Sequence, residues 1–220
     1  MMAGTASYDR WLRTVFDHPI TAGLPHWYQA PDFDSLWDPL EINHAVTIDY
    51  LTRLYTRPDV LRPYSLEQIA QGIWFLVGDS PVQPSHAILD ASVPLVARVD
   101  CVAAIAIFFR DFVGPAAPGP SRSDDDPFHM ACYMWWDLFP TWGSPGVGEP
   151  EIHRACLTTM GEALAVPSEL CQLSALHGLN HWCLHHGSQV VRTIDAFLAT
   201  TDVSPFIRDY AASARVGGAQ

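Results

Sequence analysis

The stretch from Ser168 to Gly187, SELCQLSALHGLNHWCLHHG, carries the strongest single indication of the fold. Leu, Ala, Cys and Trp occupy most of the circumference of the helix that this pattern predicts, so that helix should be largely buried. Ser168 is typical of the position before a helix, and Gly187 is typical of the position after one. We therefore expect one buried helix from Ser168 to His186.

Helix signals continue along the whole chain, whereas the two-residue alternation of β-strands is nearly absent. A first helix is predicted to start at Ser7, and Ser65 with Gln68 has the spacing of a capping box that opens another. Further helices are expected at residues 43–56, 92–113, 127–138, 150–165, 188–200 and 205–215. The expected fold class is all-α, a compact bundle or array of antiparallel helix pairs, within a single helical domain over residues 1–220.

The last third of the chain has the most regular pattern, with short connections between its predicted helices. The segment from Glu149 to Arg215 resembles HEAT-like helical-repeat proteins. Within it, ALHGLNHW at residues 175–182 is similar to the tight small-residue turns of facing helices in that class. The resemblance implies stacked antiparallel helix pairs in this third.

Two Pro-rich segments interrupt the helical pattern. The linker near residues 114–127, GPAAPGPSRSDDDP, cannot build a packed face, so we expect residues 114–126 to be the most exposed and mobile internal segment. The second segment, HWYQAPDFDSLWDP at residues 26–39, combines aromatic rings with carboxylates. Its Trp27 and Trp37 would attach a loop to the core, or would line a carbohydrate or cationic-ligand site.

Composition limits the classes of partner. The chain has 24 acidic and 12 basic residues, all of the latter Arg, which gives a net charge of -12 and argues against nucleic-acid binding. Its longest apolar run, residues 101–109, is too short to cross a membrane, and its first 20 residues lack a signal-peptide pattern. We expect a cytoplasmic protein without a membrane or nucleic-acid partner. The absence of Lys, together with abundant Ala, Pro and Arg, indicates a GC-rich bacterial genome.

His177, His181 and His185 recur at four-residue spacing in the buried helix. They share one helix face, and a pair of histidines at this spacing can hold a metal ion. The intervening residues 178–180 read GLN, so the catalytic Glu of the H-E-x-x-H motif is missing. A third ligand would have to come from His153, His129 or an aspartate on another helix.

The same face is also compatible with ordinary packing, which is the interpretation that the sequence favours. Gly178 would let a neighbouring backbone approach the helix, and Leu184 lies on the apolar side that adjoins the histidines. Buried histidines commonly bond to carbonyl groups or carboxylates. We therefore expect at least two of the three histidines to be hydrogen-bonded within the protein.

The leading functional hypothesis is a non-enzymatic protein that binds another protein through an acidic helical surface. The chain shows none of the G-x-S-x-G, Walker A or G-x-G-x-x-G motifs, so no catalytic residue and no cofactor are expected. A basic partner would be steered toward the acidic surface, as in an immunity or antitoxin-type inhibitor of a basic toxin.

The alternative hypothesis is a metal-dependent or small-molecule enzyme, or a ligand sensor, centred on the face of His177, His181 and His185. In this reading His177 and His181 are the metal ligands, and Trp27 and Trp37 contribute to ligand binding.

Overall fold

The computed structural model describes residues 6–21, 26–78, 82–117, 119, 126–141 and 143–219. Within these ranges the chain forms α-helices and short helical turns and contains no β-strand, which confirms the predicted all-α class. The α-helices are α1 (Tyr8–Phe16), α2 (Phe33–Trp37), α3 (His44–Thr56), α4 (Leu66–Val77), α5 (Leu95–Phe108), α6 (Gly114–Ala116), α7 (Pro127–Tyr133), α8 (Pro150–Leu164), α9 (Glu169–Thr200) and α10 (Pro205–Ala214). The 3-10 turns are η1 (Trp27–Gln29), η2 (Asp38–Leu40), η3 (Pro58–Leu61) and η4 (Pro84–Leu89), and η5 (Phe109–Val113) is a π-helical turn.

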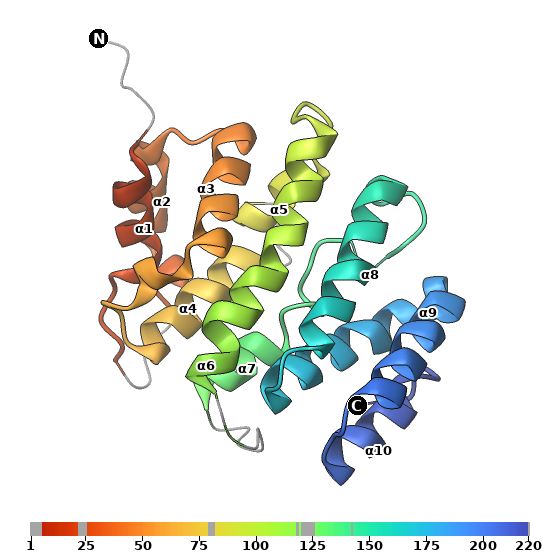
Figure 1. The fold of residues 1–220 in the computed structure, drawn as a ribbon. Coiled ribbons are helices and arrows are strands. Elements are labelled where there is room, and N and C mark those ends of the chain that lie inside the picture. The colour runs from red at the N-terminus through yellow and green to blue at the C-terminus, as the bar shows by residue number, and fades with distance from the viewer. Residues whose placement is uncertain are drawn as a thin grey trace.

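The helices are arranged in two rows (Figure 1). Helices α3, α5 and α8 pack side by side in one row, and α4, α7 and the first half of α9 form the row behind it (Figure 1). Helix α1 packs against α4 at one end of this array, and α10 packs against α9 at the other. The core between the elements is rich in large aromatic side chains, including the fully buried Trp11, Trp135, Trp136 and Trp182.

Local capping signals place most helix starts where the sequence predicts them. The Ser7 hydroxyl accepts a hydrogen bond from the backbone of Arg10 at the start of α1. Ser65 and Gln68 form both hydrogen bonds of a capping box at the start of α4. The Asp126 carboxylate accepts from two backbone N–H groups at the start of α7, where a proline follows it.

Two predicted helices have different limits in the structure. The segment predicted at residues 92–113 begins only after Pro94, and its last turn is the π-helical η5. The helix predicted at residues 127–138 ends at Tyr133. Trp135 and Trp136 follow it and are both fully buried, and a turn can place two consecutive side chains in the core more easily than a helix with one buried face.

The predicted linker is helical in its first part. Gly114–Ala116 form α6, and Ala117 is buried with its carbonyl accepting a hydrogen bond from the Ser168 hydroxyl at 3.1 Å. Within the described part of the linker Pro115 and Gly119 are exposed, whereas Ala117 is not. Residues 118 and 120–125 of the predicted linker lie outside the described residues.

The quoted stretch forms the first part of α9 and ends at a break. His186 has non-helical angles, φ -127° and ψ 25°, and two helices meet there without an intervening loop. The helices predicted at 168–186 and 188–200 are therefore the two parts of α9, although the break falls at His186 and not at Gly187. Ser168 stands at the N-cap position, but its hydroxyl makes no capping hydrogen bond and donates to the Ala117 carbonyl.

The HEAT-like arrangement expected for the last third is not confirmed. In this third α8 packs against α9, α9 has a break at His186, and α10 packs against α9. No helix in the described part of the chain is both long enough and apolar enough to cross a membrane.

Candidate metal centre

The first half of α9 provides a rigid platform for two histidines. Its residues 170–180 are buried, and it packs against α7 and α8. The side chain of His177 is 7% exposed, whereas that of His181, one turn later, is 38% exposed and lies at the edge of the buried region. The two imidazoles face each other, with their Nε2 atoms 3.2 Å apart.

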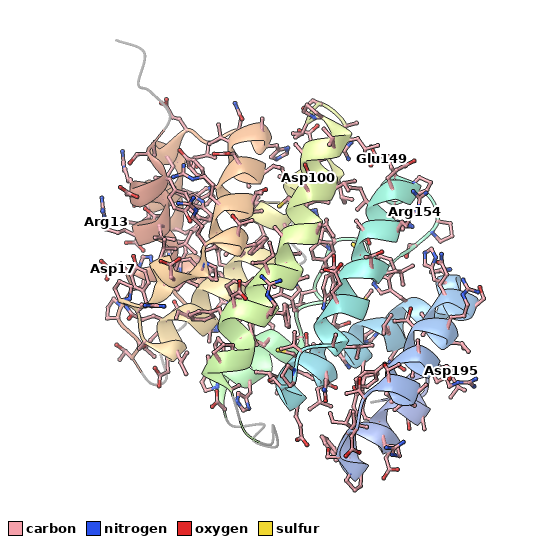
Figure 2. All side chains as sticks on the ribbon, viewed as in Figure 1. Arg13, Asp17, Asp100, Glu149, Arg154 and Asp195 are labelled. Carbon is pink, nitrogen blue, oxygen red and sulfur yellow. The ribbon has the colours of Figure 1, made fainter. Side chains whose placement is uncertain are left out.

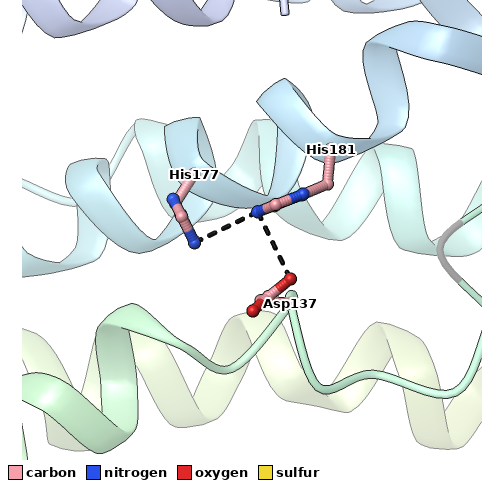
Figure 3. A group of neighbouring side chains, drawn as sticks. All are labelled: Asp137, His177 and His181. Carbon is pink, nitrogen blue, oxygen red and sulfur yellow. Dashed lines mark hydrogen bonds and ion pairs between the residues drawn. The ribbon is translucent and has the colours of Figure 1, made fainter. Parts of the chain in front are cut away.

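Asp137 completes a cluster with these two histidines (Figure 3). It lies in the turn region that follows α7, and its Oδ1 atom is 3.3 Å from His181 Nε2. One potential ligand atom from each of the three residues lies within 4.8 Å of the other two. The sequence indicated a third ligand only as one of several candidates, and Asp137 is the one that the fold brings to the histidines.

These distances suit a single bound metal ion. Two atoms that bind one ion tetrahedrally with bonds of about 2.0 to 2.2 Å lie roughly 3.3 to 3.6 Å apart. The separations of 3.2 Å between the imidazoles and 3.3 Å between imidazole and carboxylate are close to this range. His181 Nε2 is therefore at a suitable distance from each of the other two ligand atoms, and those two lie within 4.8 Å of each other.

Two tyrosines, Tyr210 and Tyr133, fix the position of His177, and one of them contacts its other ring nitrogen, Nδ1. His177 Nδ1 lies 2.9 Å from the hydroxyl of Tyr210 on α10, and that hydroxyl lies 2.8 Å from the hydroxyl of Tyr133 on α7. The ring of Tyr133 also packs on the imidazole, with their centroids 4.1 Å apart. A hydrogen bond to Nδ1 orients a metal-binding histidine so that Nε2 points at the ion.

Burial affects the protonation of His177 and of Tyr210. It lowers the pKa of His177 to about 4, with a smaller contribution from nearby His181 and an opposing one from Asp137. His177 is therefore neutral near pH 7, which is the form that binds metals. Burial and the hydrogen bond between the Tyr210 and Tyr133 hydroxyls raise the pKa of Tyr210, so its hydroxyl stays protonated.

The same atoms also form a plausible network without metal. A proton on His181 Nε2 could be donated to His177 Nε2 and to Asp137 Oδ1. His177 and His181 are both hydrogen-bonded, which confirms the prediction for at least two of the three histidines. The packing and metal interpretations thus share one set of contacts.

Other residues predicted for the site lie elsewhere. His185 is exposed and does not belong to the cluster. His153 bonds to the carbonyl of Val147 instead. Leu184 was expected on the apolar side of the helix, but it is 82% exposed because it lies in the short stretch of α9, next to the break at His186, that does not pack into the core.

Gly178 is closely packed, but its neighbour is not the backbone that was expected. A Cβ atom at this position would lie 2.5 Å from Trp136 Cβ and 2.8 Å from Met160 Sδ. The glycine therefore accommodates two side chains, one of them from the residue next to Asp137. Its small size lets the turn region that carries Asp137 lie close to α9.

The two tryptophans proposed as ligand-binding residues are far from the histidines in the chain and contact the segment around α4. Trp27 stacks on His18 and lines a pocket beside α4. Trp37 packs on Phe33 and Phe75 and does not line that pocket. Trp37 therefore behaves as an attachment to the core, and only Trp27 adjoins a space for a ligand.

Comparisons with known proteins find no match to the chain among family models, curated proteins or solved structures. The fold and the cluster together define an all-α protein with a candidate centre of two histidines and one aspartate.

Proposed function

We propose that the protein binds one divalent transition-metal ion through Asp137, His177 and His181. The observation that carries this proposal is the convergence of three ligand atoms, within 4.8 Å of one another, from two separate elements of the fold. The sequence alone favoured packing because it offered two histidines and no defined third ligand. The position of Asp137 supplies that third ligand.

The ligand types favour zinc or a neighbouring transition metal. Calcium and magnesium prefer oxygen ligands, whereas imidazole nitrogen suits zinc, iron, nickel and copper. Two histidines and one carboxylate form the protein ligand set of some catalytic zinc sites and of many non-haem iron sites. We infer zinc as the first ion to test, because the ligand spacing is close to that of tetrahedral coordination.

The exposure of the cluster supports an accessible ion. His181 is 38% exposed and Asp137 is 24% exposed, so solvent can approach the cluster from one side. Three protein ligands leave a fourth position for water or a substrate atom, which is the arrangement of catalytic sites and not of closed structural ones. A metal-activated water is the chemistry that such a centre supplies.

The proposal is tested by metal titration of the purified protein, with isothermal calorimetry and elemental analysis as readouts. We expect one zinc ion per chain, and loss of this stoichiometric binding in Asp137→Asn and in His181→Ala. His185→Ala is the matched control, because His185 is one turn further along the same helix and outside the cluster. Unaltered binding in both cluster variants, or an equal loss in the control, would refute the assignment.

A further variant tests the role of Tyr210, whose hydroxyl contacts His177. Tyr210→Phe removes the hydroxyl that lies 2.9 Å from His177 Nδ1 while it keeps the ring. Loss of such an outer partner typically weakens metal binding about 10- to 100-fold. A change of this size would support the ligand role of His177 Nε2, and no change would argue that the imidazole is held in place by packing alone.

We also propose, as a second function, that the acidic surface binds a basic protein, as an immunity or antitoxin-type inhibitor would. The net charge of -12 favours it, and exposed carboxylates such as Asp17, directly after α1, and Asp100, on α5, come from different parts of the fold (Figure 2). A pull-down from native cytosol should recover a partner that dissociates as salt is raised. Recovery of no partner at low and moderate salt would count against this function.

A further inference from the structure

A pocket of about 390 Å³ lies beside α4, the helix against which α1 packs. Its walls come from the segment after α1, from the aromatic segment of η1 and α2, from α4 and from Pro127 at the start of α7, and Figure 1 shows where these elements lie. The volume lies within the range of about 300 to 1,000 Å³ that is usual for small-molecule sites. None of the three residues of the candidate metal centre lines it.

The aromatic wall of the pocket is held in place by the surrounding structure. Trp27 is buried, and its backbone N–H donates a 2.8 Å hydrogen bond to the side chain of Gln71 on α4. Its indole stacks on the ring of His18, with the centroids 4.3 Å apart and the planes inclined by 9°. Trp74, also from α4, provides a second indole. Trp27 is therefore already in place in the absence of a ligand.

Apolar side chains that are exposed to solvent extend the pocket. Ile20 and Leu36 line it, and both are among the large hydrophobic residues that remain exposed in the described part of the chain. Exposed apolar side chains that gather at one concave site are typical of a ligand-binding surface. The body of a ligand for this pocket is therefore apolar.

The charged groups that line the pocket determine whether it favours a positively or a negatively charged ligand. The carboxylates of Asp32 and Glu67 line the pocket, and no Arg among the residues that the structure describes does so. The other titratable lining groups are His18 and His26. Burial lowers the pKa of His26, which keeps this imidazole neutral near pH 7. An anionic ligand would meet two carboxylates without a permanent positive charge, whereas a cation would be attracted by the carboxylates and by the faces of the indoles.

We propose that this pocket binds a small organic ammonium compound with an aromatic or aliphatic body. The two indoles contact its body and the carboxylates of Asp32 and Glu67 attract its ammonium group. This site is independent of the metal proposal, so either can fail without the other.

The test compares two ligands of similar shape and opposite charge, phenethylamine and 3-phenylpropionate, on the full chain. Calorimetry gives the affinities, and tryptophan fluorescence excited at a wavelength where a phenyl ring does not absorb gives an independent readout. We expect saturable binding of phenethylamine with a Kd at or below about 10 mM, which is the order expected for so small a ligand. 3-Phenylpropionate should bind at least tenfold more weakly, by the charge argument.

Variants then locate the binding in the pocket. Asp32→Asn and Glu67→Gln should each weaken phenethylamine several-fold and reduce the discrimination between the two ligands. Trp74→Leu should weaken phenethylamine by removing an indole from the wall. Asp100→Asn is the control, because this exposed carboxylate lies on α5 and does not line the pocket.

Three outcomes would overturn the proposal. They are no saturable binding of phenethylamine, equally tight binding of 3-phenylpropionate, and full discrimination between the two ligands in the carboxylate variants. Circular dichroism and the melting temperature of each variant show whether it is folded. The conservative changes at the exposed Asp32 and Glu67 keep the test decisive even if Trp74→Leu does not fold.

Discussion

Replacement of Gly178 by alanine tests the close packing between α9 and the turn region that carries Asp137. The added Cβ would lie 2.5 Å from Trp136 Cβ and 2.8 Å from Met160 Sδ, and both neighbours are fully buried. Carbon atoms in ordinary contact are about 3.5 to 4.0 Å apart, so the structure must move by roughly 1 Å. The Met160 side chain can rotate away, but a Cβ atom is fixed to its backbone.

Two opposing effects set the size of the change. Alanine in a helix interior is more favourable than glycine by about 1 kcal/mol, which would stabilise the variant. Overpacking in a closed core typically costs about 1 to 3 kcal/mol. Because relief of the contact requires Trp136 and its turn to shift relative to α9, we expect the cost to exceed the gain. A net loss of about 1 to 2 kcal/mol corresponds to a melting temperature lower by about 2 to 8 °C in a protein of this size.

Gly161→Ala is the matched control for this experiment. Gly161 also lies inside a helix, α8, but a Cβ there would meet only Thr193 Cγ2 at an ordinary distance of 3.5 Å. Without a clash the helix propensity should dominate, and this variant should be more stable by about 0.5 to 1 kcal/mol. Differential scanning calorimetry and urea unfolding of the metal-free protein measure both variants against the parent.

The reasoning would be refuted if Gly178→Ala were as stable as the parent or more so. It would also be refuted if both variants changed stability equally and in the same direction. Opposite changes would show that the space at Gly178 is filled by Trp136 and Met160.

Three further predictions concern titration, ion pairing and thiol reactivity. Because burial lowers the pKa of His177 to about 4, the unfolded chain takes up a proton between that pH and about 6.5 that the folded chain does not. The free energy of unfolding of the metal-free protein should therefore fall as the pH is lowered through this window, and His177 contributes at most about 1.4 kcal/mol per pH unit to this fall. In urea unfolding at several pH values, His177→Asn should remove the contribution of His177 to the pH dependence. Glu149→Gln should destabilise the protein by about 2 kcal/mol in the same assay, because it leaves the buried Arg98 guanidinium without the carboxylate that pairs with it at 2.6 and 2.7 Å. The loss of one partner from a fully buried ion pair costs about 3 to 5 kcal/mol, and we expect less here because the Glu149 side chain is 33% exposed. Of the five cysteines only Cys183 is not buried, so one thiol per chain should react quickly with a thiol reagent in the native state, and Cys183→Ser should abolish that reaction in a mass-spectrometric assay.

Sequence reasoning succeeds in this protein where the signal is local. A cap such as Ser65 with Gln68, or Asp126 before a proline, is made by residues that are neighbours in the chain, so its position follows from the sequence. The all-α class follows for the same reason, since it is the sum of such local preferences.

Features that depend on distant contacts could not be placed in the same way. Asp137 precedes its histidine partners by about forty residues, and nothing in its local pattern distinguishes it from the other aspartates. The exposure of Leu184 depends on the break of α9 at His186 and on the packing around it, which a helical period does not reveal. The wall of the pocket likewise combines Trp27 with α4 through a contact with Gln71 that lies 44 residues away in the chain.

The break in α9 at His186 has a consequence for how the length of this chain can vary. The His186 ring lies 3.1 Å from the Gly143 carbonyl and 3.2 Å from the side-chain oxygen of Gln189, and no loop separates the two halves of the helix. Loops absorb inserted residues, but one residue inserted after the break, between Gly187 and Val190, would rotate the rest of that helix by about 100° and remove Val190, Ile194 and Phe197 from the core. We therefore expect related chains to differ in length at their loops while the spacing between His186 and Val190 stays constant.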